Sequence, residues 1–113
     1  MNLVATCPMS SWREWLEEGD CAGDPATGKE WGFFIGNRLP PIEIGERLYI
    51  VSYGRLRGYS LVTRVQEGCI CRKGNAIAIT IPDMITGFRG YRRVWWNEST
   101  EIPFPNWKTE GVK

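Results

Sequence analysis

The chain has 113 residues, which is long enough for one domain with a single hydrophobic core. Apolar residues make up 42% of the sequence, an ordinary share for a globular protein that excludes a wholly disordered chain. The net charge is +1, no apolar run reaches the ~18 residues of a membrane-spanning helix, and histidine is absent, which excludes histidine-based catalytic triads and histidine-ligated metals.

The first element expected along the chain is a short helix over residues 11–18. Ser11 can cap this helix, and Glu14 three residues later completes a capping box. One apolar stripe is formed at positions i, i+3 and i+4 by Trp12, Trp15 and Leu16. A two-turn helix is not stable alone, so we expect the stripe to pack against a sheet. Residues 19–29 are rich in Gly, Asp, Pro and Thr and predict a loop.

Short strands are expected over most of the remaining chain. Residues 31–35 predict the first strand, and residues 47–53 predict the clearest one. A return strand over residues 59–65 would complete a hairpin, with the glycine-framed residues 54–58 as its turn.

The second half of the chain predicts three more strands. Two are expected over residues 69–72 and 76–81, separated by a short turn at 73–75. Residues 83–90 fit either one helical turn or a loop, and residues 92–96 predict the last strand.

The tail, with Pro103, Phe104, Pro105 and Trp107, is expected to fold back over the sheet. Together, five to seven short strands and one or two short helices predict an α+β fold, mostly β, over a single domain of residues 1–113. We expect a small curled sheet or pseudo-barrel, because closing a sheet removes its exposed edges.

Positive charge is concentrated in the middle of the chain. Residues 1–46 carry a net charge of −5, residues 47–96 a net charge of +7 and residues 97–113 a net charge of −1. Eight of the nine cations in the middle segment are arginines, whose planar guanidinium suits phosphates and base edges and stacks on rings. This segment predicts a nucleic-acid surface, and the alternative is a set of solvated strand faces paired with the acidic N-terminal third.

Four cysteines raise the question of a metal site. Cys69 and Cys71 are separated by one residue, whereas structural zinc sites use C-x₂₋₄-C pairs. On a strand both side chains would point to one face, which does not suit a mutual disulfide. We expect reduced, partly buried thiols and no metal; a zinc site that adds Cys7 and Cys21 is the alternative.

The N-terminal segment does not fit a signal peptide. Residues 1–9 carry no basic residue, and Pro8 interrupts them. We therefore expect a cytoplasmic protein without a membrane partner.

The middle of the chain resembles the strand–turn–strand heart of the PUA-like superfamily, which includes the ASCH and EVE domains. The run Ile44-Gly45-Glu46-Arg47-Leu48-Tyr49-Ile50-Val51 and the following Gly54-Arg55-Leu56-Arg57-Gly58-Tyr59 carry this resemblance. The resemblance covers residues 44–62 closely and the rest of the chain only by length and strand count. It implies a pseudo-barrel of mixed strands with a cleft that binds RNA or modified bases in nucleic acid.

The same resemblance raises an enzymatic alternative, because some ASCH-type members resemble small amidases that use a lysine, a threonine and a glutamate. Thr27, Lys29 and Glu30 stand before the first expected strand. The ASCH pattern G-x-K-x-x-E-x-R is not reproduced, since Gly28 adjoins Lys29 and no Glu-x-Arg follows at the required offset. An amidohydrolase acting on an acylated nucleoside stays an alternative, and the sequence assigns no catalytic residue and no cofactor.

Arginines and aromatic rings alternate between Gly87 and Trp96. Single-stranded nucleic acid is held by cations that follow the phosphates and by rings on which bases stack, each stack worth about 1–3 kcal/mol. Trp95 and Trp96 are adjacent, so we expect at least one of them in the core, and Tyr91 or Phe88 as the exposed ring.

These patterns predict a module that recognises RNA or a modified nucleobase in a basic, aromatic-lined cleft. Contacts to phosphate or base edges are expected from Arg55, Arg57, Arg89, Arg92 and Arg93. Stacking on a base is expected from Trp31, Tyr53 or Tyr91. A protein-interaction or inhibitor module without a nucleic-acid ligand is the alternative, because tryptophan and arginine are enriched at interface hot spots and the net charge is low.

Overall fold

The computed structural model describes residues 1–7, 30–34, 42–66, 69–73, 77–87, 90–107 and 109–110. The helix expected over residues 11–18 and the loop expected over residues 19–29 lie outside these ranges.

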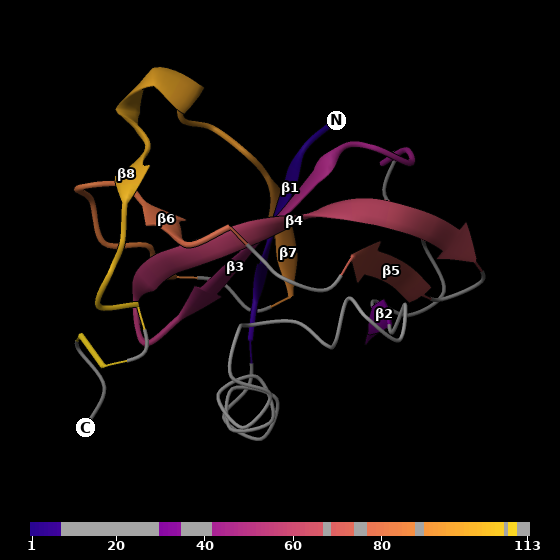
Figure 1. Ribbon diagram of the computed structural model, residues 1–113, viewed down its shortest axis with the longest axis horizontal. Helices are drawn as coiled ribbons and strands as arrows, with labels where there is room; N and C mark the ends of the chain where they lie inside the picture. The colour runs from indigo at the N-terminus through magenta and orange to yellow at the C-terminus, as the bar shows by residue number, and fades with distance from the viewer. Residues whose placement is uncertain are drawn as a thin grey trace.

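Strands dominate the described part of the chain. They are β1 (Leu3–Thr6), β2 (Glu30–Phe34), β3 (Arg47–Ser52), β4 (Arg55–Gln66), β5 (Cys69–Lys73), β6 (Ile79–Thr80), β7 (Tyr91–Arg93) and β8 (Ile102–Pro103), with the short 3-10 helix η2 (Glu98–Thr100) before β8. One sheet has the order β2-β5-β4-β3-β1-β7, and β6 pairs separately with β8. The large sheet curls into a half-barrel, with β4 arching across it (Figure 1). The expected mostly β fold with a curled sheet is confirmed at this level.

The hairpin expected in the middle of the chain is confirmed, but its turn is shorter than predicted. Only Tyr53 and Gly54 connect β3 to β4, with φ angles of +51° and +71°. Two consecutive positive φ angles are typical of a two-residue type I′ turn, whose twist matches that of the flanking strands. The prediction of a turn over residues 54–58 is therefore wrong, and Arg55 and Arg57 lie on β4.

Gly58 lies inside β4 because another segment approaches its backbone closely. A Cβ atom at this position would stand 2.6 Å from the carbonyl oxygen of Ile77. Ile77 forms an isolated bridge with Tyr59, and the register of β3 and β4 shifts beside Gly58, between Ile50 and Val51. The glycine therefore marks a contact inside the sheet and does not mark a turn.

The sequence analysis does not predict β1, although this strand lies within the sheet. Leu3–Thr6 pairs in parallel with β3 and antiparallel with β7. Leu3, Val4 and Ala5 are all buried. A strand buried on both faces has no alternation of polar and apolar residues, so four such residues carry little periodic signal.

The bounds and the number of the last strands differ from the prediction. Residues 69–72 fall within β5, which lies between β2 and β4, whereas β6 covers only Ile79–Thr80 and pairs with β8. Residues 83–87 contain no helix. β7 is not the last strand, because the tail returns as β8 and buries Phe104 and Trp107. The prediction that the tail folds back over the sheet is confirmed.

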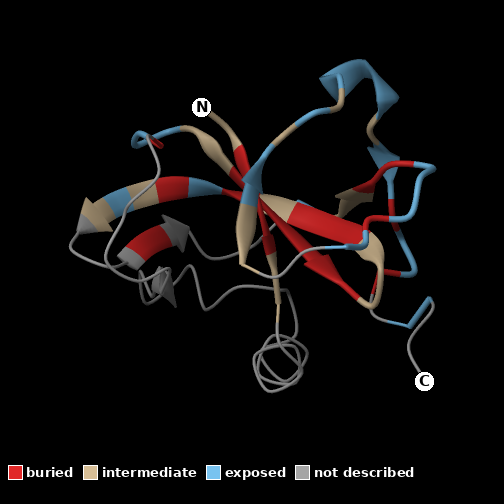
Figure 2. Cartoon of the chain, turned by 180° about the vertical axis from the view of Figure 1, so that it is seen from behind, coloured by how far each residue is buried: buried red, intermediate tan, exposed pale blue. Residues whose placement is uncertain are grey.

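The core occupies both faces of the central strands. Leu48 and Ile50 belong to one buried cluster, which also contains Phe104, and Tyr49 and Val51 belong to the other. Because side chains alternate along a strand, one apolar run serves both clusters. Figure 2 shows buried residues along the middle of the sheet and exposed residues around η2 and β8.

Candidate functional site

Arg57, one of the expected ligand contacts, is buried in the core at 0% exposure. Its Nε donates to the carbonyl of Ser52 and its NH1 to the carbonyl of Trp107, each at 3.0 Å. The guanidinium carbon lies 5.4 Å from the centre of the Phe104 ring. Burial lowers the pKa of Arg57, and the positive charge of Arg55 lowers it further. Arg57 therefore ties the β3–β4 hairpin to the C-terminal segment, and this position removes it from the expected contact surface.

Arg55 lies two residues earlier on β4 and is also engaged by the C-terminal half of the chain. Its NH1 donates to Glu110 Oε1 at 2.8 Å, and its NH2 donates to Thr80 Oγ1 at 3.4 Å. The guanidinium carbon lies 5.0 Å from the centre of the Phe104 ring. The side chain of Arg55 is 19% exposed, so it reaches solvent only beside an acidic partner from its own chain.

Tyr53, expected to stack on a base, is half-buried at the hairpin turn. It packs against the core cluster that contains Leu3 and Trp107. Only part of the ring is therefore available to a ligand.

Strand β7 carries three of the expected site residues. Tyr91 is half-buried against the core, whereas Arg92 and Arg93 are exposed. Arg92 pairs with Val4 and Arg93 with Leu3. Because Val4 and Leu3 belong to clusters on opposite faces, the two arginines leave β7 toward opposite faces of the sheet.

The remaining expected residues are not described as side chains. Arg89 lies outside the described residues, and of Trp31 only the backbone is described, on β2. Thr27 and Lys29 of the amidase alternative also lie outside, and Glu30 is described only as the first backbone position of β2.

The described arginines that are expected to contact the ligand form two groups, whereas the sequence predicts one cleft. Arg55 and Arg57 lie on β4, and Arg92 and Arg93 lie on β7, with β3 and β1 between them. At the usual spacing of neighbouring strands, the backbones of the two groups stand about 14 Å apart across the sheet.

The sequence analysis expects Tyr91 or Phe88 as the exposed ring of this segment; Tyr91 is half-buried, Phe88 lies outside the described residues, and Trp95 is exposed. Trp95 is 55% exposed and follows Arg93 by two residues. The sequence analysis expects at least one of the two tryptophans in the core; Trp96 is half-buried and packs against a core cluster without being part of it. Their rings meet edge to face with centres 5.1 Å apart.

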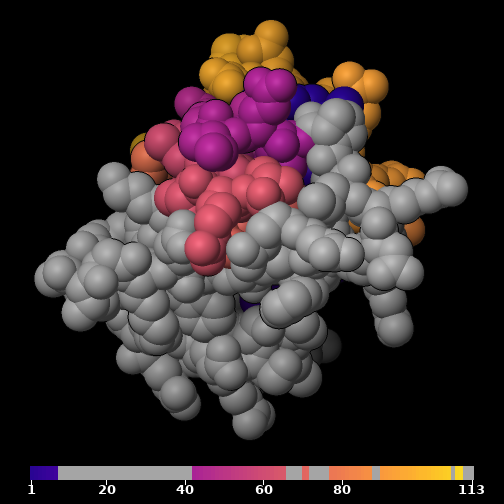
Figure 3. Space-filling model, turned by 90° about the vertical axis from the view of Figure 1, so that its right-hand side faces the viewer, coloured from indigo at the N-terminus to yellow at the C-terminus, as the bar shows by residue number. Residues whose placement is uncertain are grey.

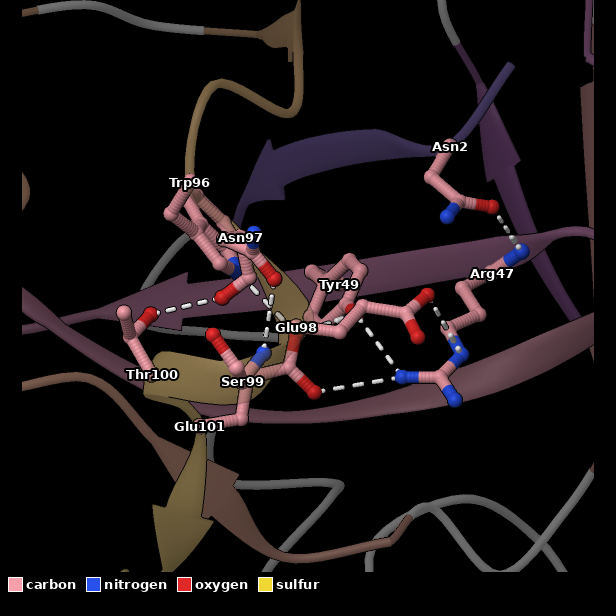
Figure 4. Close-up of polar contacts among 9 residues, drawn as sticks. All are labelled: Asn2, Arg47, Tyr49, Trp96, Asn97, Glu98, Ser99, Thr100 and Glu101. Carbon is pink, nitrogen blue, oxygen red and sulfur yellow. Dashed lines mark hydrogen bonds and ion pairs between the residues drawn. The ribbon is translucent and has the colours of Figure 1, made fainter.

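A carboxylate network that the sequence analysis does not predict joins the same region to β3. The Glu101 carboxylate accepts hydrogen bonds from the Tyr49 hydroxyl, from Trp96 Nε1 at 3.0 Å and from Arg47 NH1 at 3.1 Å (Figure 4). Arg47 also lies over the Tyr59 ring, 4.2 Å from its centre. On the side of the molecule in Figure 3, the gold segment around η2 lies against the magenta residues that include β3.

Local turn chemistry places Glu101 in this network. Asn97 caps η2 by accepting a hydrogen bond from the backbone N–H of Ser99 at 2.9 Å. The backbone N–H of Glu101 closes the turn by donating to the carbonyl of Glu98 at 3.1 Å. Glu98 itself lies 3.8 Å from the Nε of Arg47 and is exposed. The capped turn therefore directs one glutamate inward and leaves the other at the surface.

The chain matches no family model, no curated protein and no solved structure. Its function is therefore argued from the arrangement of its own residues.

Tyr49 gives the network a pH dependence. Burial raises the pKa of Tyr49 above its ordinary value of 10.0, and the hydrogen bond to Glu101 raises it further. As the pH rises above about 10, the Tyr49 hydroxyl loses its proton in the unfolded chain but keeps it in the folded protein. The contribution of this hydroxyl to the free energy of unfolding is therefore complete below about pH 10 and is lost as the pH rises further. We expect the wild-type unfolding free energy to fall by up to about 1.4 kcal/mol more per pH unit than that of Tyr49→Phe. Urea unfolding of both proteins at about pH 8 to 11 measures this difference, and parallel pH profiles would contradict it.

Metal ligands do not cluster among the described side chains. No group of three or more of the usual ligand residues is arranged there to hold a metal ion. Cys7 is half-buried and Cys71 is buried. The sulfur of Cys71 lies 3.8 Å from NH2 of Arg64. Cys21 and the side chain of Cys69 lie outside the described part. Within the described residues there is also no helix long and apolar enough to cross a bilayer.

Proposed function

We propose that this protein binds single-stranded nucleic acid, either RNA or a strand with a modified base, along β7 and the residues that follow it. The observation that carries the proposal is the placement of Arg92, Arg93 and Trp95. Residues 92–95, at an edge of the sheet, contain two exposed arginines and a tryptophan that is 55% exposed. Guanidinium groups bind phosphates, and bases stack on exposed aromatic rings without needing a particular sequence.

The edge position of β7 supports this proposal. β7 stands last in the order of the large sheet, with β1 on its inner side. Arg92 and Arg93 leave it toward opposite faces, so a nucleic-acid strand along this edge would meet a cation from each side.

The contacts behind Trp95 also support the proposal. The Trp96 ring stands edge to face against Trp95, and Trp96 is held in turn by its hydrogen bond to Glu101. A ring that is already oriented loses less conformational freedom when a base stacks on it. The network around Glu101 thus prepares the exposed ring for binding.

We also propose that the sheet is of the PUA-like kind. This is supported by the parallel pairing of β1 with β3 in an otherwise antiparallel sheet, which is a curled sheet of mixed strands. The nucleic-acid proposal rests on the groups of β7 and would stand without this resemblance.

Titration of a fluorescently labelled single-stranded RNA at low salt tests the proposed surface. Trp95→Ala is expected to weaken binding about 5- to 150-fold, the equivalent of one lost base stack of about 1–3 kcal/mol. Arg93→Ala should weaken binding and reduce the slope of log K against log salt by about 0.7, because one phosphate contact is lost. Arg64→Ala is the matched control, since it removes an exposed arginine from β4, away from β7. The proposal fails if wild-type protein does not bind at low salt, or if Arg64→Ala weakens binding as much as Arg93→Ala.

A protein-interaction function is the second candidate, and the exposure of large apolar side chains favours it. Within the described ranges, six large apolar residues are 42–70% exposed, namely Ile44, Leu61, Ile77, Met84, Trp95 and Ile102. Apolar contacts persist at high salt, whereas exposed charge contacts are screened. This candidate predicts a stoichiometric protein partner that co-purifies from the native host at high salt and is lost with Trp95→Ala. Failure to recover such a partner counts against it.

A further inference from the structure

Four aromatic rings form a continuous row from the surface into the core. Trp95, which is 55% exposed, meets Trp96 edge to face with ring centres 5.1 Å apart. Trp96 meets the buried Tyr49 in the same manner, again at 5.1 Å, and Tyr49 lies 5.2 Å from Tyr59. These separations are those of rings in direct contact. Because electron transfer slows steeply with distance, neighbouring rings of this row can exchange an electron.

One carboxylate oxygen joins the proton donors of the two middle rings. The Tyr49 hydroxyl and Trp96 Nε1 both donate to Oε2 of Glu101, the indole at 3.0 Å (Figure 4). Arg47 NH1 donates to the other oxygen, Oε1, at 3.1 Å and to the Tyr49 hydroxyl oxygen at 3.0 Å. The Glu101 side chain is 8% exposed, which keeps these contacts largely out of bulk water. A proton can therefore pass between Tyr49 and Trp96 through Oε2, which is within hydrogen-bond reach of both.

We propose that these residues form a one-electron relay, which moves an oxidising equivalent from Trp95 at the surface to Tyr49 in the core. The oxidant belongs to the class of outer-sphere one-electron acceptors in solvent, such as a photo-excited flavin. It takes one electron from Trp95 and is itself reduced by one electron. Trp95 regains an electron from Trp96, and the Trp96 radical cation passes its indole proton to Glu101 Oε2, since the loss of an electron makes that N–H acidic.

Tyr49 receives the oxidising equivalent in the last step. Its ring gives one electron to Trp96, and its hydroxyl proton moves to Glu101 Oε2 while the proton already on that oxygen returns to Trp96 Nε1. Both tryptophans are then restored. The net change is one electron passed to the oxidant, one proton passed from Tyr49 to Glu101, and a neutral tyrosyl radical at Tyr49.

Arg47 makes Tyr49 the end of the relay. Its guanidinium carbon lies 4.2 Å from the centre of the Tyr59 ring, so a positive charge on that ring would be repelled. Its NH1 can still donate to the Tyr49 oxygen after the hydroxyl proton has left. The relay needs no nucleic acid, so this inference does not rest on the proposed function.

Flash photolysis with tris(bipyridine)ruthenium(III) as the soluble one-electron oxidant tests the relay. We expect a tryptophan radical that decays with a matching rise of a tyrosyl radical, followed by transient absorption and identified by electron paramagnetic resonance. Tyr49→Phe keeps the ring but has no hydroxyl proton to give, so it should abolish this rise and prolong the tryptophan radical. Tyr91→Phe removes another half-buried tyrosine, outside the row, and should leave the rise unchanged.

The proton path through Glu101 has its own test. Glu101→Gln leaves no carboxylate to accept the proton, so we expect tyrosyl formation to slow about 100-fold or more, as when a positioned proton acceptor is lost. Glu98→Gln removes an exposed carboxylate of the same turn and should leave the rate unchanged. Thermal unfolding of each variant establishes that it is folded at the temperature of the measurement. The inference is overturned if the wild type forms no tyrosyl radical, if Tyr49→Phe forms it as fast as the wild type, or if Glu101→Gln and Glu98→Gln change the rate equally.

Discussion

Replacing Arg57 by alanine is expected to lower the free energy of unfolding by about 3–5 kcal/mol, the loss typical of a large side chain deleted from a core. The substitution empties the space beside Phe104 and removes the donors to the carbonyls of Ser52 and Trp107. Carbonyl groups that stay buried without a donor each cost about 1–3 kcal/mol. Urea unfolding followed by tryptophan fluorescence measures the effect.

Arg57→Met separates the energetic effect of losing the hydrogen bonds from the effect of losing the side-chain volume. Methionine fills much of the space of the arginine stem but donates nothing, so we expect a loss of at least about 2 kcal/mol from the two unpaired carbonyls, and a smaller loss than for Arg57→Ala. Hydrogen exchange at the amide of Trp107, which donates to the carbonyl of Phe104, should accelerate in both variants as the C-terminal segment loosens. A loss below about 1 kcal/mol for Arg57→Ala would contradict a structural role for this arginine.

Glu101→Ala is expected to cost about 2–4 kcal/mol, because the hydroxyl of the buried Tyr49 and the indole N–H of the half-buried Trp96 lose their shared acceptor. Glu101→Gln keeps one acceptor oxygen and should cost less. Glu98→Ala is the matched control, since it removes an exposed glutamate that also lies near Arg47, and it should cost no more than about 1 kcal/mol. Thermal and urea unfolding of the three variants give these values, and equal losses for Glu101→Ala and Glu98→Ala would show that the network does not stabilise the fold.

The sequence predicts those elements whose signal is local. The hairpin of β3 and β4, the positions of β2 and β5 and the return of the tail all follow from apolar runs bounded by Gly and Pro. β1 and β8 are too short to show a period, and long-range pairing with β3 and β6 defines them. The sequence places the turn between β3 and β4 too far along the chain, because Gly58 resembles a turn residue. In the structure, glycine is required at position 58 by the close approach of Ile77.

The candidate site is harder to predict than the fold, because the type of a residue does not reveal its burial. Arg57 has the same local context as Arg55, and only the returning tail decides that it becomes a core residue. The Glu101 network joins positions about fifty residues apart, which no local pattern signals. By contrast, the closeness of Arg93, at the end of β7, and Trp95, two residues after it, is a local signal, and it points to the surface proposed here.

The most direct test of that surface is the response of the indole Nε1–H NMR signals to a single-stranded RNA. The chain has six tryptophans, so assigned indole signals report several regions at once. The proposal predicts that the Trp95 indole and the amides of Arg92 and Arg93 shift during the titration, while the indole of the buried Trp107 does not. A spectrum without shifts, or with shifts that leave Trp95 and β7 unchanged, would contradict it.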